Sequence, residues 1–196
     1  MKYTLRIPRR AGIVLAALLV LGIASMVGVP AQQARAAGDA YAMVGKPLPD
    51  IELRDKDGKV YPMQRLRGRT AILFFSEGLM CYPACWDQIA AFANDRRFDG
   101  KDIVAISVVV DPPRVWQKAA AKMPDLAKAT VLFDAGASIS RRLGLLSLRS
   151  SMHPGQLPGH TYVLVDGRGV VRDVIDDANM AVNNEMLLKL IAKLKR

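Results

Sequence analysis

The stretch that decides the fold runs from Thr70 to Trp86 and reads TAILFFSEGLMCYPACW. Its opening, TAILFF, is a short and nearly continuous apolar run, which is typical of a strand buried on both faces. A short loop follows, and then Cys81 and Cys85. Pro83 suits the first turn of a helix, and apolar residues recur at helical spacing behind it. The stretch therefore predicts a buried strand, a loop and a helix, with both cysteines at the junction.

Cys81 and Cys85 are the only two cysteines of the chain. At the start of a helix, the backbone amides and the macrodipole stabilise a thiolate and lower the pKa of a thiol. A thiolate attacks disulfides and peroxides, and a second thiol one helical turn away can resolve the product. A purely structural disulfide across so short a loop would add little stability. We therefore predict that Cys81 attacks and that Cys85 resolves.

The segments on either side of this stretch predict the other elements of one domain. Asp57-Gly58 is a turn signal between two short apolar stretches, so we expect a β-hairpin there. Runs rich in apolar and β-branched residues predict further strands, and amphipathic or proline-opened segments predict helices. The strands are expected at 103–110, 131–133, 161–165 and 170–175, and the helices at 86–93, 111–122, 137–143 and 183–195. This order predicts an α/β fold with a mixed central sheet flanked by helices.

Several motifs follow one another in an order known from one group of proteins. Gly45 to Leu53, GKPLPDIEL, is similar to a G-x-x-x-P-D-F-x-L opening, with Ile51 in place of Phe. The later motifs are Asp57-Gly58-Lys59, Leu66-Arg67-Gly68-Arg69, Leu73-Phe74-Phe75, Asp134, Arg142-Leu143-Gly144 and His160-Thr161-Tyr162-Val163-Leu164-Val165-Asp166. By these motifs the chain resembles the redoxin branch of the thioredoxin superfamily. This branch includes the alkyl hydroperoxide reductase/thiol-specific antioxidant proteins and the TlpA-like proteins.

The resemblance implies a thioredoxin-like fold and a peroxiredoxin-like, thiol-dependent oxidoreductase of the antioxidant type, without a cofactor. The implied partners are a peroxide or a protein disulfide/dithiol as substrate, and a thiol electron donor. Thioredoxin-like reductases have two residues between the cysteines, whereas three separate Cys81 from Cys85. Typical peroxiredoxins carry Pro and Thr before the peroxidatic cysteine and an Arg near the late strand. Residues 76–80 contain neither Pro nor Thr, and Gly159-His160 stands near the place of that Arg.

The three-residue spacing is also similar to that of the Sco copper-chaperone family, which pairs C-x-x-x-C with a distant His just before a strand. His160 stands at such a place, and Trp86 stands where that family usually has Pro. Two thiolates and one imidazole suit copper. The alternative interpretation is therefore a copper-binding chaperone with Cys81, Cys85 and His160 as ligands.

Other side chains near the pair are weighed by their chemistry. His160 is either an assisting group, because imidazole is the natural proton shuttle for a thiolate, or a structural residue at a strand entrance. Pro158 is a candidate for the cis bond that often precedes this strand in the thioredoxin fold. The remaining candidates are interpreted as structural or solvated: Trp86 packing under the active-site loop, Met80 as a packing residue, Glu77 as a solvated loop acid and His153 as an incidental loop residue.

The first 36 residues have the pattern of an export segment. A basic start, Lys2 to Arg10, precedes an uncharged apolar run from Ala11 to Val29. A proline ends the run, and Ala34-Arg35-Ala36 is similar to a signal-peptidase site. Two interpretations stay open: a cleaved signal peptide, or an anchor in the inner membrane formed by residues 11–29.

Both interpretations place a redoxin domain, residues 44–196, outside the cytoplasm, periplasmic or secreted, where disulfides persist. Residues 37–43 are expected to be a linker, and the membrane is contacted only through the N-terminal segment. The formal charge of the chain is +10, but five of its 28 basic residues and none of its 18 acids lie in the first 36, so the remainder carries only +5. No stripe of basic and aromatic residues is present, so we expect no nucleic-acid partner.

Overall fold

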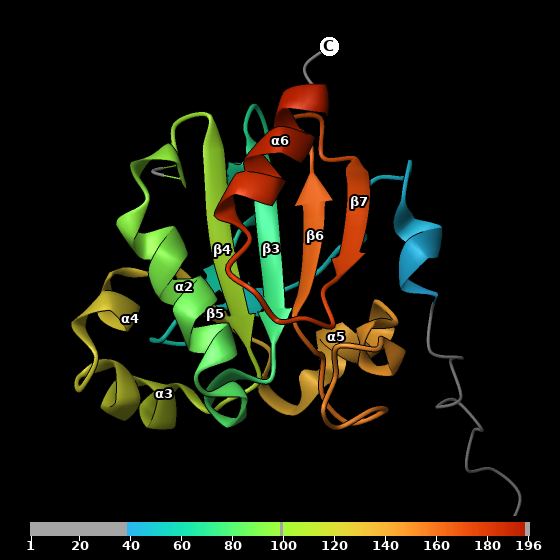
Figure 1. Cartoon of the computed structure of the whole chain (residues 1–196). Helices are drawn as coiled ribbons and strands as arrows, with labels where there is room; N and C mark the ends of the chain where they lie inside the picture. The colour runs from blue at the N-terminus through green and yellow to red at the C-terminus, as the bar shows by residue number, and fades with distance from the viewer. Residues whose placement is uncertain (1–38, 99, 195–196) are drawn as a thin grey trace, which may run out of the picture. The chain divides into compact units, whose positions relative to one another are not determined.

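The strand predicted from TAILFF is β3, Thr70–Ser76, which pairs with a strand on each side in a seven-stranded sheet. The structure is a computed structural model that describes residues 39–98 and 100–194. The strands follow the order β2-β1-β5-β4-β3-β6-β7, and Figure 1 labels the five from β5 to β7. The other strands are β1 Leu53–Arg54, β2 Val60–Tyr61, β4 Ile103–Val109, β5 Val131–Phe133, β6 Thr161–Val165 and β7 Val171–Asp176.

The sheet is mixed, as predicted. β3 runs parallel to β4, and β4 runs parallel to β5, because helical connections return the chain to the same edge. β6 is antiparallel to both β3 and β7, and β1 is antiparallel to both β2 and β5. The helices are α2 Ala84–Asn94, α3 Pro113–Ala120, α4 Pro124–Lys128, α5 Ser138–Arg142 and α6 Asn184–Leu194.

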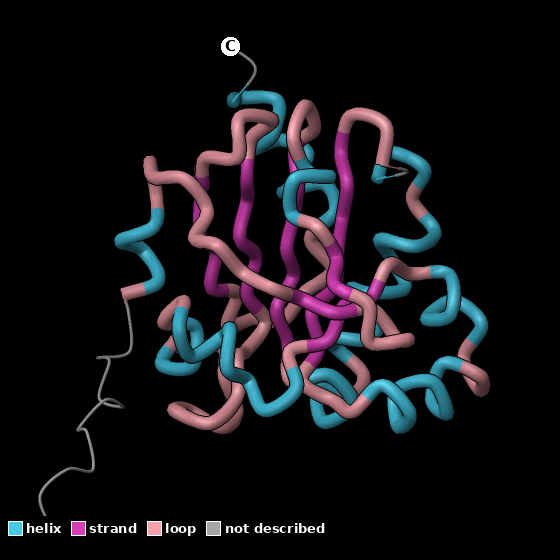
Figure 2. The backbone as a smooth tube through the Cα atoms, turned by 180° about the vertical axis from the view of Figure 1, so that it is seen from behind, coloured by secondary structure: helices cyan, strands magenta, loops and turns pink. Residues whose placement is uncertain are grey.

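The alternating side chains of β3 enter two separate apolar cores, one on each face of the sheet. Ile72 and Phe74 pack with residues of α2 and α6, which lie in front of the sheet in Figure 1. Leu73 and Phe75 pack on the opposite face, which loops and short helical segments cross (Figure 2). Burial of one such side chain stabilises the fold by about 1.5–3 kcal/mol. This two-sided burial explains why the strand reads as a continuous apolar run.

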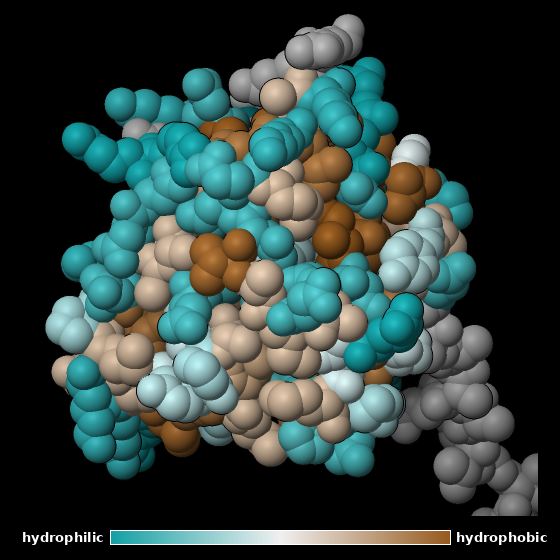
Figure 3. Space-filling model, viewed as in Figure 1, coloured by the Kyte–Doolittle hydropathy of each residue, from teal (hydrophilic) through white to brown (hydrophobic). Residues whose placement is uncertain are grey.

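The helices α2 and α6 turn their apolar sides inward. Ile89 and Phe92 of α2, and Leu187 and Ile191 of α6, are buried against the sheet. The outer surface of the same face is a mixture of hydrophilic areas and smaller apolar ones (Figure 3). The packing fixes α2 over β3, and the cysteine pair lies at the start of this helix.

Two sequence-based expectations about the chain's organisation need correction. Ala40–Met43, expected to lie in a linker, forms a 3₁₀-helix (η1) that starts on an Asp39 side-chain hydrogen bond to the Tyr41 amide. Ala40 and Met43 are buried in one of the two cores, so the folded domain begins before residue 44. The short helix α4 was not expected, because its five residues, opened by Pro124, contain no full amphipathic repeat.

The proposed export segment, residues 1–36, lies outside the described residues. Within 39–98 and 100–194, no helix combines the length and the apolar character needed to cross a membrane. The signal peptide or membrane anchor predicted for residues 1–36 therefore stays a prediction.

The strand directions bring three chain segments to one edge of the sheet. β3 and β4 run in parallel and end there, whereas the antiparallel β6 begins there. The pairing of Phe75 with Thr161 places the residue before β6 beside the residues that follow β3. The sheet thus brings His160 to the cysteine pair across 75 positions of sequence.

Candidate active site

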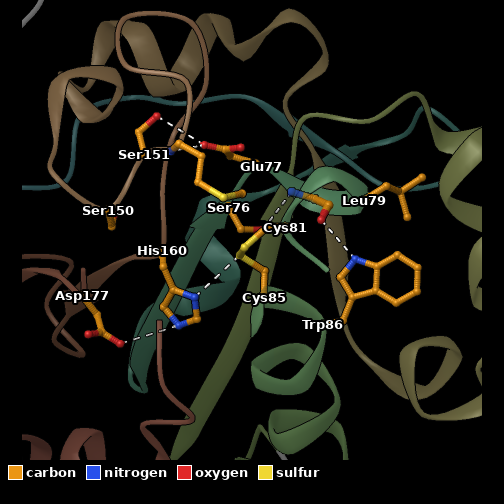
Figure 4. The surroundings of a disulfide bond; sticks show 12 residues. Ser76, Glu77, Leu79, Cys81, Cys85, Trp86, Ser150, Ser151, His160 and Asp177 are labelled. Carbon is orange, nitrogen blue, oxygen red and sulfur yellow. Dashed lines mark hydrogen bonds and ion pairs between the residues drawn. A yellow bond between two sulfur atoms is a disulfide. The ribbon is translucent and has the colours of Figure 1, made fainter. Parts of the chain in front are cut away.

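Cys81 and Cys85 form a disulfide, with their Cα atoms 5.4 Å apart (Figure 4). Cys81 ends a 3₁₀-helix, η3 Gly78–Cys81, and Cys85 lies in the first turn of α2. The predicted location between the buried strand and the helix is therefore confirmed. Cys81 is 3% exposed and Cys85 is fully buried, so Cys81 is the outer of the two residues. In the described part of the chain, the one cis peptide bond precedes Pro83, and Pro158 does not have one.

Asp111 and Trp86 hold η3 in place from two sides. Asp111, just after β4, accepts a hydrogen bond from the Leu79 amide at 2.9 Å, and burial raises the pKa of this carboxyl. Gly78 has a φ of +65°, and a Cβ built there would lie 1.7 Å from the Asp111 carboxylate. Only glycine fits this position. On the other side the Trp86 indole donates to the Gly78 carbonyl at 3.1 Å, which confirms that Trp86 packs against the active-site loop.

His160 approaches the disulfide from the side opposite Trp86 (Figure 4). Its ring is fully buried, with Nδ1 3.6 Å from the Cys85 sulfur and Nε2 2.7 Å from the Tyr162 hydroxyl. Burial lowers the pKa of His160 from 6.5 to about 4, although Asp177 and a backbone hydrogen bond at Ala181 partly oppose this effect. The imidazole is therefore neutral at pH 7 and can accept a proton.

The buried imidazole makes stability depend on pH. The unfolded chain takes up a proton on His160 below pH 6.5, whereas the folded chain does so only near pH 4. Stability is therefore complete above pH 6.5 and falls as the pH drops toward 4, by up to about 3 kcal/mol from this group. We expect His160→Gln to unfold with a shallower acid dependence over this window. Urea unfolding of both proteins at several pH values measures this dependence. Equal changes of the free energy of unfolding with pH in the two proteins would contradict the lowered pKa of His160.

Glu77, which is buried, and His153, which is partly exposed, form a contact that corrects two interpretations. Glu77 is 1% exposed, so it is not a solvated loop acid. Its carboxylate contacts His153 Nδ1 at 2.7 Å and accepts from the Met152 amide at 2.6 Å and the His153 amide at 3.2 Å. These donors offset the cost of burying the acid. His153 is therefore not incidental: with Glu77 it ties the end of β3 to the loop that leads to His160.

Met80 also differs from expectation. It is 59% exposed, so it does not serve as a packing residue. It lies in η3 directly before Cys81, where Gly78 and Cys81 take the buried positions instead.

The two sulfurs and one imidazole nitrogen form a possible ligand set for a metal ion. One ligand atom each from Cys81, Cys85 and His160 lies within 4.8 Å of the others. Thiolates and neutral imidazole suit copper, so the chemistry of these donors fits the alternative interpretation. The disulfide seen in the structure offers no thiolate, so only the reduced pair could hold an ion.

The network behind His160 was missed by sequence reasoning. Tyr162 and Gln88 are fully buried and bonded to each other at 2.8 Å, and Gln88 also accepts from the Asn183 amide. A signal for Gln88 was present, because it stands three residues after Cys85 on the buried face of α2. A polar residue among apolar ones at helical spacing indicates a buried hydrogen-bonding partner.

A central strand that ends at a redox-capable cysteine pair, with an antiparallel neighbour that supplies a residue beside it, defines a thioredoxin-fold redoxin. The chain belongs to the AhpC/TSA family, whose model matches residues 44–174. Family membership and the cysteine pair make it a peroxiredoxin-like, thiol-dependent oxidoreductase. No curated protein matches the sequence.

Several solved structures have the same fold at low sequence identity. A peroxiredoxin-like protein from Aquifex aeolicus has a TM-score of 0.61 at 17% identity, covering 77% of this chain and 86% of its own. Peroxidoxin BcpB from Mycobacterium tuberculosis has a TM-score of 0.60 at 22% identity, covering 78% of this chain and 96% of its own. Enterococcus faecalis AhpC has a TM-score of 0.60 at 17% identity, covering 78% and 92%. At these identities the likeness establishes the fold alone.

Proposed function

We propose that this protein is an exported antioxidant oxidoreductase that reduces a peroxide or a disulfide at the expense of a thiol donor. Cys81 reacts with the substrate and Cys85 resolves the product. The observation that carries the proposal is the contact of 3.6 Å between the Cys85 sulfur and Nδ1 of a buried His160. A thiol that must attack needs to lose its proton, and this neutral imidazole is placed to accept it.

With a peroxide the steps balance as follows. The Cys81 thiolate attacks an oxygen, the O–O bond breaks, and the products are a Cys81 sulfenic acid and, after protonation, an alcohol or water. His160 takes the proton of the Cys85 thiol, and the Cys85 thiolate attacks the Cys81 sulfur. The S–O bond breaks, and the leaving hydroxide takes the proton from His160 and departs as water. Two thiols have then supplied two electrons, and two donor thiols, or one dithiol, restore them by exchange and become a disulfide themselves.

Burial favours a small oxidant. Cys81 is 3% exposed and Cys85 is not exposed at all. A peroxide or a small disulfide needs little room beside Cys81, whereas the disulfide of a folded protein would require the surrounding loops to move. The greater exposure of Cys81 also supports it as the residue that meets the substrate first.

Export rests on the basic and apolar pattern of residues 1–36. A protein that cycles through a disulfide also suits an oxidising compartment. Cell fractionation followed by sequencing of the mature N-terminus tests this part. A start near residue 37 means cleavage, an intact N-terminus in the membrane fraction means an anchor, and an intact protein in the cytoplasm contradicts export.

Copper binding is the second candidate function, and one observation favours it. Ligand atoms of Cys81, Cys85 and His160 lie within 4.8 Å of one another. In this function copper would be a cargo held by the reduced protein. Its affinity would disappear in His160→Ala, which removes the imidazole.

One titration separates these functions. The fully reduced protein is treated in parallel with hydrogen peroxide, with oxidised glutathione and with Cu(I), and free thiols and protein mass are followed. We expect stoichiometric oxidant to convert both thiols to the Cys81–Cys85 disulfide, dithiothreitol to reverse it, and catalytic turnover with excess reductant. Thiols that resist both oxidants while one Cu(I) binds per chain would overturn the proposal in favour of copper.

A further inference from the structure

Behind His160 lies a chain of buried and partly buried hydrogen bonds, and its direction is set by groups that can only donate or only accept. The Asn184 side chain donates through Nδ2 to the Ala91 carbonyl at 3.1 Å and to the Asp95 carboxylate at 3.1 Å. Both partners can only accept, so Asn184 Oδ1 must be the oxygen. That oxygen accepts from Gln88 Nε2 at 2.9 Å. The amide of Gln88 is therefore fixed as well.

The hydrogen bonds of Gln88 Oε1 fix the orientation of the same amide independently. Gln88 Oε1 accepts from the Asn183 backbone amide at 2.7 Å, which can only donate. The same oxygen faces the Tyr162 hydroxyl at 2.8 Å. Because the amide oxygen of Gln88 carries no hydrogen and can only accept, the single hydroxyl proton of Tyr162 must point to Gln88. Burial raises the pKa of Tyr162, so the phenol keeps this proton.

The Tyr162 oxygen can then only accept from the side of His160. His160 Nε2 lies 2.7 Å from it, which is a short hydrogen bond that requires a proton on Nε2. A neutral imidazole carries one proton, so Nδ1 is left with its lone pair. Nδ1 is the nitrogen that faces the Cys85 sulfur at 3.6 Å.

We propose that Gln88 and Tyr162 are positioning residues that hold His160 in the Nε2–H tautomer, so that Nδ1 serves as the proton acceptor for the Cys85 thiol. The inference rests on the proposed function for its catalytic meaning, but the tautomer itself is a property of the fold. With the opposite tautomer, Nδ1 would carry a hydrogen toward the sulfur and would have no lone pair for the thiol proton.

Asp177 completes the arrangement on the Nε2 side. Its carboxylate lies 4.0 Å from His160 Nε2 and accepts hydrogen bonds from the Ala181 amide and the Asn183 side chain. When His160 takes the thiol proton it becomes an imidazolium, and this fixed negative charge stabilises it. Phe74 packs against the ring, with 4.6 Å between the ring centroids, and holds it in the plane that the hydrogen bonds require.

Two substitutions at Gln88 form a matched pair. Gln88→Leu removes the acceptor for the Tyr162 proton, so the hydroxyl turns to donate to Nε2 and the imidazole proton moves to Nδ1. Gln88→Glu keeps an oxygen acceptor for the Tyr162 proton, and the protonated acid donates to Asn184 Oδ1 as the Gln88 amide does, so the Nε2–H tautomer is preserved. Where Gln88→Leu does not fold, Tyr162→Phe removes one oxygen atom and also removes the Tyr162 oxygen as an acceptor for the Nε2–H. Tyr61→Phe, on the edge strand β2, is the control for loss of a tyrosine hydroxyl.

The main measurement is the ¹⁵N spectrum of the imidazole rings in the reduced protein, where the pattern of nitrogen shifts identifies each tautomer. The chain contains only two histidines, so the His153 signal is an internal reference. We expect Nε2–H in the wild type, Gln88→Glu and Tyr61→Phe, and Nδ1–H in Gln88→Leu and Tyr162→Phe. An Nδ1–H ring in the wild type, or an unchanged ring in both Gln88→Leu and Tyr162→Phe, overturns the proposal.

The second measurement is the rate at which oxidised Cys81 becomes the disulfide after one equivalent of hydrogen peroxide, followed by quenching and mass. We expect a fall of about 100-fold in Gln88→Leu, the size of a lost general base, and a fall of no more than a few-fold in Gln88→Glu. Equal slowing of disulfide formation in both Gln88 variants would overturn the proposed role of His160 Nδ1 as the proton acceptor. If the wild type is not oxidised at all, the proposed function fails while the spectrum still decides the tautomer.

Discussion

Replacing Cys85 with serine yields a protein that reacts once with substrate and then stops. Without the Cys85 thiolate, the sulfenic acid or mixed disulfide on Cys81 has no neighbour able to displace it, because a serine hydroxyl is not ionised near pH 7. We expect resolution of the adduct within the protein to slow by at least about 1,000-fold, as on loss of a catalytic nucleophile. The protein is mixed with one equivalent of peroxide or oxidised glutathione without dithiothreitol, because a dithiol would itself reduce the adduct on Cys81, and the trapped adduct is detected by mass.

Cys81→Ser is the matched control, because it removes the other sulfur from the same short segment. This variant is expected to form no adduct and to show no turnover. A Cys81→Ser protein with full thiol-dependent turnover would contradict the assignment of the attacking residue. An adduct found on Cys85 in the wild type after rapid quenching would reverse the roles of the two cysteines.

Gly159→Ala is expected to destabilise the fold strongly, because the added Cβ would overlap backbone atoms. A Cβ at Gly159 would lie 2.2 Å from the Ser150 carbonyl carbon and 2.2 Å from the Ser151 amide nitrogen, so backbone must move to admit it. Overpacking of this severity costs about 3 kcal/mol. The melting temperature should fall by about 10 °C, which a thermal unfolding scan measures. Because His160 is the next residue, the rate of disulfide formation should fall as well.

Gly169→Ala separates steric overlap from backbone strain. Gly169 has a φ of +83° with no atom within 4 Å of its Cβ position, so alanine there meets only the conformational cost, about 1 kcal/mol. Gly159→Ala should therefore be clearly less stable than Gly169→Ala. Equal melting temperatures for the two variants would mean that the loop at Ser150 yields without cost.

The sequence predicted the sheet well where local pattern and tertiary environment agree. The run Thr70–Phe75 is apolar because both faces are covered, and the turn at Asp57-Gly58 sits between β1 and β2 as its residue types require. The pattern did not reveal that Ala40 and Met43 are buried. Short segments of small and apolar residues carry no period, and what decides their burial is a distant neighbour, β7.

The sequence predicted Cys81, Cys85 and His160 as candidate site residues, because the residue types cysteine and histidine by themselves indicate reactive side chains. The contact between Glu77 and His153 was not legible, since acids and imidazoles in loops are usually solvated and the two residues are 76 positions apart. Gln88 and Tyr162 likewise acquire their roles only when α2 and β6 meet. Contacts of this kind between distant side chains depend on the topology of the fold, which a single sequence does not determine for the reader.

The position of His160 beside Cys85 is maintained by the pairing of β3 with β6. If β6 detaches from β3, the imidazole leaves the thiol, even where α2 remains helical. A rapid assay of disulfide closure would therefore count molecules whose long-range strand contacts are in place. During refolding, circular dichroism would follow the early helices, and recovery of closure would time the later docking of β6. Recovery of disulfide closure therefore reports when β6 pairs with β3, a contact between segments far apart in the sequence, and such contacts form slowly.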